Sequence, residues 1–404
     1  MSSGAPIDGG RARRRLLIEA WRFVPHSYAL AAQAYCLSLL QRDDVELRFT
    51  DLPYYQTWRR TQGLLPAGEE SALAALRGPE PYFAPEATFT LRPESPDFSA
   101  PPSGRRFAFG TAEYRVLRQQ NRSGLRSAAE VADTVSVVTP SRWPALAYER
   151  FGIPGERIHI VPLGVDPAVF RPDAAARRAT REALGLQDAF IYLSVGAMTW
   201  NKGLDVLLAA FAHIVETERD AVLFLKGADA IYDSEDLVRR VLGTLSPSAR
   251  AAVAAKLVYE GGTYPSASMA DLLRAADVYV SPYRAEGFNM PVLEAAACGT
   301  PVICTAGGPT DEFTEEPFAR RIRSLPRQVS YDGGDIGDYL APDADHLVEL
   351  MRQAAHGRDD AARIGAMGAE YVARNFSWRR VTDRLADVLF AGATSAQRDS
   401  ARKT

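Results

Sequence analysis

Two glutamates in the stretch EGFNMPVLE, Glu286 and Glu294, are separated by seven residues and have different surroundings. Glu286 precedes a Gly-Phe-Asn turn, whereas Glu294 lies within a short helix that Pro291 can begin and Gly299 can end. Backbone amides at the start of a helix attract phosphate. Carboxylates that lie beside a phosphate site can accept hydrogen bonds from hydroxyl groups of the same ligand. The stretch therefore indicates a ligand with both phosphates and hydroxyls, such as a nucleotide diphosphate sugar.

Two candidate side chains, Glu294 and Lys202, can also be explained without a ligand. A carboxylate early in a helix, such as Glu294, complements the helix dipole even without a ligand. Lys202 follows a predicted strand and precedes a helix, and it is one of four lysines in an arginine-rich chain. That position favours contact with an anion, and the alternative is a solvated surface lysine.

Strands and helices alternate in both halves of the chain, and these elements must position the candidate residues. Alternation at this spacing implies a parallel sheet that is covered by helices on both faces. We therefore expect an α/β protein with two doubly wound domains facing each other across a cleft. Ligands of such sheets bind at the carboxyl ends of the strands. Between the first strands, residues 52–104 are rich in Pro, Gly and aromatic residues and show little periodicity. We expect an irregular acceptor-binding loop there.

Composition narrows the functional class. A chain of 404 residues is too long for one compact core, which favours two domains. The formal net charge of -3 argues against nucleic acid as a partner. Three cysteines without a CxxC pair fit a cytoplasmic location, and no apolar run is long enough for a membrane span. Residues 1–185 carry 24 Arg, no Lys and 20 acidic residues, a formal charge of +4 that would suit peripheral contact with a membrane.

The sequence EGFNMPVLEAAACGTPVI resembles the E-x7-E signature of glycosyltransferase family four, a retaining family of GT-B fold. Further similarity covers most of 134–390. The resemblance implies two Rossmann-like domains facing across a cleft. The expected boundaries are an acceptor-binding domain at 1–171 with a disordered tail at 1–13, a linker at 172–189, a nucleotide-sugar-binding domain at 190–376, a helix that crosses back to the first domain at 377–392, and a tail at 393–404.

The resemblance also implies roles for individual residues. Glu286 would contact hydroxyls of the donor sugar, Glu294 the ribose, and Lys202 the departing diphosphate. Lys202 and Glu286 would thus be the catalytic residues. The implied donor site also includes the neighbouring positions Gly196, Gly287, Phe288, Asn289 and Met290.

Three positions depart from the family pattern. Ala197 stands where the family often has an arginine, so one of two expected phosphate cations is missing. His26 and Ser27 lie where the family has a glycine-rich loop. They are candidate donor or acceptor contacts, or alternatively a helix cap. Glu113 lies at a strand end where the family has a histidine, and it could act on an acceptor hydroxyl or form a surface ion pair.

The resulting interpretation is a retaining glycosyltransferase of hexosyltransferase type, active in carbohydrate biosynthesis. It would move a sugar from a nucleotide diphosphate sugar to a hydroxyl acceptor without a metal or other cofactor. The acidic motif DAD at 343–345 is interpreted as a helix cap. A sugar-nucleotide epimerase of the same fold and a non-catalytic nucleotide-sugar-binding protein are the alternatives. The sugar, the base and the acceptor (lipid-linked glycan, natural product or small polyol) stay open.

Overall fold

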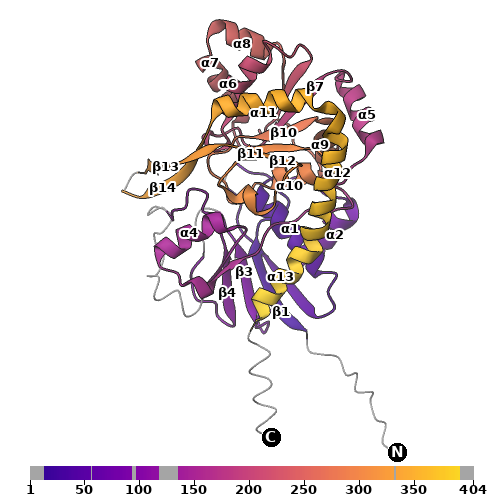
Figure 1. Cartoon of the computed structure of the whole chain (residues 1–404). Helices are drawn as coiled ribbons and strands as arrows, with labels where there is room; N and C mark the ends of the chain where they lie inside the picture. Colours follow the sequence, from indigo (N-terminus) through magenta and orange to yellow (C-terminus); the bar gives the residue numbers. More distant parts are fainter. Residues whose placement is uncertain (1–12, 56, 93–96, 118–134, 332–333, 392–404) are drawn as a thin grey trace, which may run out of the picture.

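A computed structural model describes residues 13–55, 57–92, 97–117, 135–331 and 334–391. In these ranges the chain forms two parallel six-stranded sheets, one in each half of the molecule (Figure 1). Residues 1–12 and 392–404 lie outside the described ranges, and so do the disordered tails predicted there.

The first sheet has helices on both faces. Its strand order is β2 (Val45–Asp51), β1 (Arg14–Ala20), β3 (Ala87–Leu91), β4 (Arg105–Phe109), β5 (Val135–Thr139) and β6 (Ile158–Ile160). The accompanying helices are α1 (Ser27–Leu39), α2 (Ala67–Ala75) and α4 (Arg142–Phe151). Every residue of β3 and of β5 is buried, as expected for central strands that are covered on both faces.

The prediction of an irregular loop over 52–104 is wrong. This segment contains α2 and the central strand β3, which pairs with β1 and β4. The pentapeptide ATFTL alternates apolar residues with β-branched threonines, which is a strand signal, but it is short and was overlooked within the surrounding Pro-rich sequence. Its strand conformation depends on hydrogen bonds to strands that are distant in the sequence.

The second sheet repeats the arrangement more regularly. Its order is β12 (Ala319–Ile322), β11 (Val302–Thr305), β10 (Val278–Ser281), β7 (Phe190–Val195), β8 (Ala221–Lys226) and β9 (Leu257–Glu260). The helices in this part are α6 (Leu204–Ile214), α7 (Ser234–Thr244), α8 (Pro247–Ala254), α9 (Ser266–Ala275), α10 (Met290–Ala297) and α11 (Ala344–His356). Along β7, Phe190 and Tyr192 pack in the same cluster as α6 and α11, whereas Ile191 and Leu193 pack in the cluster that includes α9 and α10. Because side chains alternate along a strand, β7 contributes apolar side chains to the clusters on both faces of the sheet.

The order of the second sheet decides which loops are neighbours. Parallel strands end at the same edge, and β10, β7, β8 and β9 are consecutive there. The loops that follow them carry Glu286, Lys202, Gly227 and Tyr264 respectively. Residues from four separate βα units are therefore brought to one edge, where ligands of such sheets bind.

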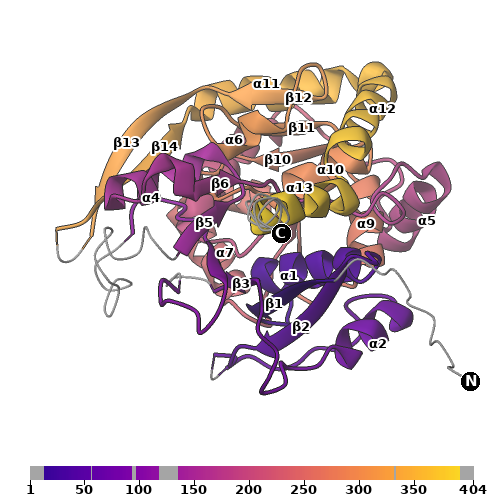
Figure 2. The same cartoon turned by 90° about the horizontal axis from the view of Figure 1, so that it is seen from below.

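Three further helices connect the halves of the molecule. The predicted linker 172–189 contains α5 (Ala174–Leu184), which is fixed to the second domain because Arg181 Nη1 lies 3.0 Å from Asp277 Oδ2. After α12 (Arg358–Asn375), α13 (Trp378–Phe390) crosses to the first domain and packs beside α1 (Figure 2). There Arg105 donates a 2.9 Å hydrogen bond to the carbonyl of Leu389. The exact domain boundaries stay predictions.

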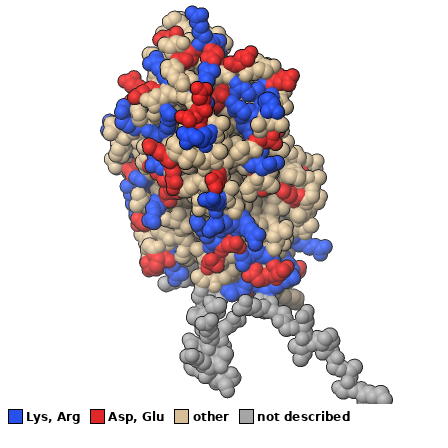
Figure 3. All heavy atoms as spheres, turned by 45° about the vertical axis from the view of Figure 1, so that its right-hand side comes forward, with Lys and Arg blue, Asp and Glu red and all other residues tan. Residues whose placement is uncertain are grey.

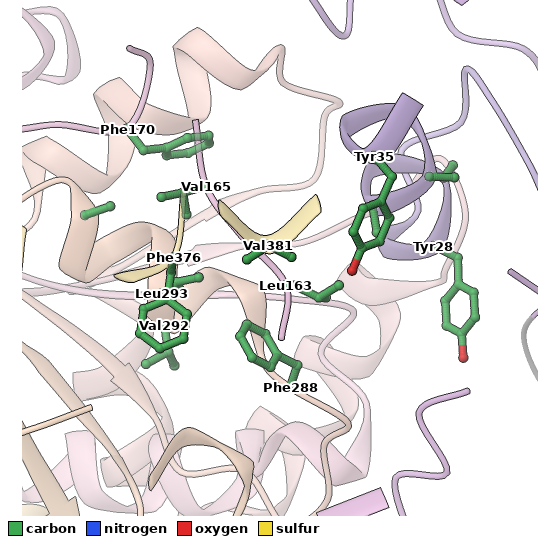
Figure 4. Close-up of a cluster of buried hydrophobic side chains, with 14 of the residues drawn as sticks. Tyr28, Tyr35, Leu163, Val165, Phe170, Phe288, Val292, Leu293, Phe376 and Val381 are labelled. Carbon is green, nitrogen blue, oxygen red and sulfur yellow. The ribbon is translucent and has the colours of Figure 1, made fainter. Parts of the chain in front are cut away.

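One continuous apolar core joins the two domains. Figure 4 shows Tyr35 of α1, Leu163 from the connection after β6, and Phe288 and Val292 from the loop and helix after β10. All four side chains are buried. Because this cluster includes residues of both domains and of the returning chain, it holds the edges of the two sheets against each other.

A β-hairpin of the second half forms another connection. Strands β13 (Ser324–Ser330) and β14 (Ile336–Pro342) pair antiparallel and extend toward α4 (Figures 1 and 2). Asp338 of β14 accepts from Arg150 at 2.6 Å, and its backbone amide donates to the carbonyl of Tyr114 at 2.7 Å. The hairpin therefore fixes the loop after β4 in the first domain.

The face of the molecule shown in Figure 3 has mixed charge. On the face shown in Figure 3, basic and acidic side chains are interspersed over both halves of the molecule. In the described ranges, none of the helices combines the length and the apolar character that crossing a bilayer requires.

Candidate active site between the two domains

A cleft of about 1570 Å³ lies between the carboxyl edges of the two sheets. Ligand pockets typically measure about 300–1,000 Å³, so this cleft has room for two substrates. Its walls come from both domains. The lining includes the predicted site residues His26, Ser27, Glu113, Gly196, Lys202, Glu286, Gly287, Phe288, Asn289, Met290 and Glu294.

The loop after β10 turns sharply into α10, as its sequence predicts. Asn289 adopts the left-handed conformation with φ of 76°, which Asn tolerates better than most residues, and the helix begins at Met290 with Pro291 in its first turn. It ends after two turns at Ala297, and Gly299 follows with φ of 79°. Gly287 is required by proximity, because a Cβ there would lie 2.3 Å from Thr111 Cβ of the first domain.

Lys202 and Glu286 form an ion pair at the centre of the cleft. Glu286 is 4% exposed, and Lys202 ends the short 3-10 turn Trp200–Lys202 after β7. A Cβ at Gly196 would lie 3.3 Å from Lys202 Cε, so this glycine makes room for the lysine side chain. Burial alone would lower the pKa of Lys202, but the carboxylates of Glu286 and Glu113 outweigh it and raise that pKa. The ammonium therefore stays charged.

Glu113 approaches the same pair from the first domain. It follows β4, and its Oε2 accepts a 3.1 Å hydrogen bond from Asn201 Nδ2 of the second domain. Burial and the nearby charge of Glu286 raise its pKa to about 7, although Lys202 acts in the opposite direction. Glu286 thus pairs with the ammonium group while Glu113 acts on it through its charge, and Glu113 can exchange a proton near neutral pH.

Glu294 lies on α10, away from the ion pair. Burial raises the pKa of its carboxyl group to about 7. Hydroxyl groups of a ligand can both donate to and accept from such a carboxyl group. Helix-dipole compensation alone would favour the charged form, so the raised pKa indicates that burial dominates at this position.

Two neighbouring side chains point into the protein. Phe288 stacks on Phe313 with ring centroids 4.5 Å apart, and Asn289 Nδ2 donates to Ser281 Oγ at 3.0 Å. Phe288 and Asn289 are predicted to contact the donor. Because their side chains are directed into the protein, such contacts would involve their backbone atoms. The loop is also held across the cleft, because Ser141 Oγ of the first domain donates to the carbonyl of Gly287 at 2.7 Å.

His26 serves as a helix cap at the wall of the cleft. Its Nδ1 accepts a 3.2 Å hydrogen bond from the backbone amide of Tyr28 at the start of α1. Burial and the charge of Lys202 lower its pKa to about 4, so the ring is neutral at pH 7 and carries its proton on Nε2. Its ring lies 5.1 Å from that of Trp58, and the adjacent Ser27 is exposed.

A second lysine of the cleft was missed by the sequence interpretation. Lys226 is the last residue of β8 and is 2% exposed. The signal that singled out Lys202, a rare lysine at the end of an apolar strand, is also present in AVLFLKG. At Ala197, where the family often has an arginine, the backbone carbonyl accepts from Ser234 Oγ at 3.0 Å.

The fold is similar to that of solved proteins of GT-B architecture. Sucrose-phosphate synthase from Thermosynechococcus elongatus superposes with a TM-score of 0.65 at 18% identity, covering 93% of this chain and 98% of that one. HepE from Anabaena, crystallised with UDP-glucose, superposes with a TM-score of 0.65 at 14% identity, covering 93% and 99%. The predicted GT-B fold with two Rossmann-like domains is confirmed.

Sequence similarity is concentrated in the second domain. Residues 189–321 match the family described as Glycosyl transferases group 1, so this domain is a group 1 glycosyltransferase domain and the resemblance to family four is confirmed. D-inositol 3-phosphate glycosyltransferase 1 from Catenulispora acidiphila is 31% identical over 58% of this chain and 52% of that protein. The chain thus spans about half the length of this curated relative.

Among the residues that the structure describes, no three His, Cys, Asp or Glu side chains are grouped so that they could hold a metal ion. The motif at 343–345 lies at the start of α11, where Asp343 Oδ1 accepts from the amide of His346 at 3.0 Å. It is the helix cap that the sequence predicts. Independence from metal stays a prediction.

Proposed function

We propose that the protein is a retaining glycosyltransferase that moves a hexosyl group from a nucleotide diphosphate sugar to a hydroxyl acceptor. The observation that carries this proposal is the arrangement of Lys202, Glu286 and Glu113 in one interdomain cleft. The group 1 domain and the structural likeness to an enzyme crystallised with UDP-glucose support it.

Donor binding would rearrange the central ion pair. Lys202 has Glu286 as its partner in the free protein. A diphosphate that enters the cleft replaces Glu286 at the ammonium group, and the released carboxylate accepts hydrogen bonds from the sugar hydroxyls. Glu294 holds the ribose. Because Glu286 and Glu113 are both acidic, the ammonium would be essential for admitting an anionic donor.

The transfer step would depend on stabilisation of the leaving group. The bond between the anomeric carbon and the phosphate oxygen breaks, and its electrons stay on the diphosphate, whose growing charge Lys202 stabilises. The acceptor oxygen bonds to the anomeric carbon on the same face. Its proton passes to the departing phosphate oxygen. Before the transfer, the acceptor hydroxyl donates its hydrogen bond to Glu113, on the acceptor side of the cleft, which orients it. As the bond to the phosphate breaks, the same hydrogen turns from Glu113 to the departing phosphate oxygen.

Release of nucleoside diphosphate distinguishes a glycosyltransferase from an epimerase and from a non-catalytic nucleotide-sugar-binding protein. Purified full-length protein is incubated with UDP-, GDP- and ADP-sugars, each with and without a panel of polyols, sugar phosphates and glycosides, in the presence of EDTA. We expect acceptor-dependent release of the diphosphate and an α-linked product from an α-linked donor. Conversion of a donor without acceptor would indicate the epimerase. Binding without any turnover would indicate the non-catalytic alternative.

The same assay examines two further expectations. Activity that survives EDTA supports metal independence, and activity that is lost and then restored by Mg²⁺ or Mn²⁺ contradicts it. Flotation with vesicles that contain anionic lipid examines the predicted peripheral contact with a membrane. The cytoplasmic location is retained as a prediction.

A further inference from the structure

Lys226 is a buried lysine whose pKa is lowered by burial, while the nearby charges of Glu260 and Asp229 act in the opposite direction. Its Nζ donates to the carbonyl of Gly227 at 2.7 Å and also to the carbonyl of Gly262, and it lies 4.8 Å from the ring centroid of Tyr264. In the described ranges it forms no ion pair, although it is only 2% exposed. An unpaired buried charge is costly, and two neutral carbonyls compensate it only in part.

The acidic residues near Lys226 are bonded to other groups. Glu260 Oε1 accepts from the amide of Gly262 at 2.6 Å, and Asp229 Oδ1 accepts from Tyr259 at 2.7 Å. Both carboxylates thereby shape the loops around the lysine. An ammonium has three N–H donors, and the two carbonyls use two of them. Since Lys226 lines the cleft, a ligand can take the third.

Lys226 and Lys202 flank the same glycine. The amide of Gly196 donates to the carbonyl of Lys226 at 3.0 Å, and the methylene groups of Lys202 pack against Gly196 from the other side. Strands β7 and β8 are neighbours, so the two lysines stand on adjacent strand ends. Of the described residues in the strand-end loops of the second sheet, these two lysines are the cations that line the cleft.

Charge balance in the cleft favours a second cation near the diphosphate. Lys202 already faces two carboxyl groups, Glu286 and Glu113, and Glu294 is a third acidic group in the same wall. A nucleoside diphosphate brings further negative charge. A single lysine would leave the occupied site with a marked excess of negative charge, which is unfavourable at low dielectric constant. Ala197 cannot contribute a side-chain charge.

We propose that Lys226 forms a diphosphate-binding subsite, in which its ammonium group binds a non-bridging phosphate oxygen of the nucleotide. It thus supplies, from the end of the adjacent strand, the second cation that Ala197 does not provide. This inference rests on the proposed function, because it concerns the nucleotide sugar of the same cleft. The Tyr264 ring and the carbonyls of Gly227 and Gly262 hold the ammonium group in place between ligand-binding events.

Calorimetric titration of the full-length protein with UDP, GDP and ADP tests the subsite, together with the corresponding nucleosides. Lys226→Met removes the charge and keeps most of the side-chain volume. We expect its affinity for the nucleoside diphosphate that binds the wild type to fall about 10- to 100-fold, which is the effect of losing one charge-assisted hydrogen bond. Nucleoside affinity should change less than twofold. The matched control is Lys256→Met, since Lys256 is a partly exposed lysine of the same domain that lies outside the cleft lining and donates to the carbonyl of Arg219.

A second variant covers the case in which Lys226→Met does not fold. Lys226→Gln keeps an N–H donor for the neighbouring carbonyls but removes the charge, and the same loss is expected. Circular dichroism and thermal melting establish folding. A folded variant with wild-type affinity for the diphosphate overturns the inference, and so does an equal loss for nucleoside and diphosphate, which would place Lys226 at the base. Absence of nucleoside diphosphate binding by the wild type would contradict the proposed function itself.

Discussion

The two domains of this protein present their functional groups in different ways. In the second domain, regular βα units carry the functional groups: Lys226 ends β8, Lys202 and Glu286 lie in the loops after β7 and β10, and Glu294 lies on α10. In the first domain, His26 caps α1 and Glu113 lies in a loop that the hairpin of the second domain holds in place. The family match covers only residues 189–321. We interpret the second domain as the side of the cleft that binds the donor on regular βα units. The first domain would bind the acceptor with a loop whose position depends on contacts with the second domain.

The contrast also concerns protonation. In the second domain, the nearby carboxylates raise the pKa of Lys202, so its ammonium group stays charged. Glu113 of the first domain and Glu294 of the second both have a pKa raised to about 7, so the charge of each changes with pH in the physiological range, but only Glu113 lies on the first-domain side of the cleft. Variants in the second domain should therefore affect the donor and the chemical step. Variants in the first should affect the acceptor and the pH dependence.

The largest effect is expected from the central ion pair. Lys202→Ala should lower kcat by about 10²–10³-fold, by analogy with loss of one donor to a developing oxyanion. Glu286→Gln should also act mainly on kcat, because this side chain contacts the reacting sugar. Steady-state kinetics with circular dichroism check both, and Lys256→Ala is the control. Turnover at the wild-type rate in both folded variants would place the catalytic cleft elsewhere.

A smaller effect, confined to the donor, is expected from Glu294. Its contact with the ribose is the same before and during the reaction, so Glu294→Gln should weaken donor affinity about 10- to 100-fold and leave kcat nearly constant. Calorimetric titration with the nucleoside diphosphate measures this directly. Glu156→Gln, an exposed carboxylate of the first domain, is the matched control. A fall in kcat as large as that of Lys202→Ala, with donor affinity intact, would contradict the assignment.

Glu113 provides the test of the acceptor side. Its charged form accepts the hydrogen bond of the acceptor hydroxyl, so the wild-type acceptor KM should fall as pH rises through about 7. Glu113→Gln should raise the acceptor KM several-fold at pH 8 and remove this pH dependence. Donor KM should change much less. A pH profile that Glu113→Gln leaves unaltered would assign the titration to another group, such as Glu294.

Raised carboxyl pKa values also affect stability. Burial raises the pKa of Glu294 from its ordinary value of 4.5 to about 7. The folded protein therefore binds more protons than the unfolded chain between these values, and this contribution to the free energy of unfolding is lost as pH rises toward 7. The same Glu294→Gln variant should accordingly show a flatter dependence of Tm on pH between 5 and 8 than the wild type.

The smallest effect is expected where the hairpin joins the two domains. Asp338 accepts from Arg150, whose side chain is half exposed, and such partly exposed pairs contribute about 0.2–1 kcal/mol. Asp338→Asn should raise the acceptor KM by no more than a few-fold and leave kcat unchanged. Arg239→Gln removes an ion pair on α7 and serves as the control. A change in donor affinity without a change in acceptor KM would show that the hairpin does not act through the loop of Glu113.

Features set by nearby residues could be predicted from the sequence. The turn and short helix after β10 depend on Asn289, Pro291 and Gly299, which are close together in the chain. The alternation of strands and helices predicted the fold, and the spacing of Glu286 and Glu294 indicated a site on the second domain. Periodicity and turn chemistry act over a few residues, so they can be read without knowing the partners.

Long-range proximity was decided only by the tertiary structure. The alternation in ATFTL is a local strand signal, but only the pairing with β1 and β4 shows that β3 is a central strand of the first sheet. Glu113 has a raised pKa because the fold buries it beside Glu286, and Lys226 has its surroundings because the loops after β8 and β9 meet around it. A pKa or a charge balance depends on all neighbouring groups. The sequence therefore singled out Lys202, Glu286 and Glu294 as candidate donor residues, which stay predictions, whereas only the tertiary structure showed how the charges in the cleft are combined.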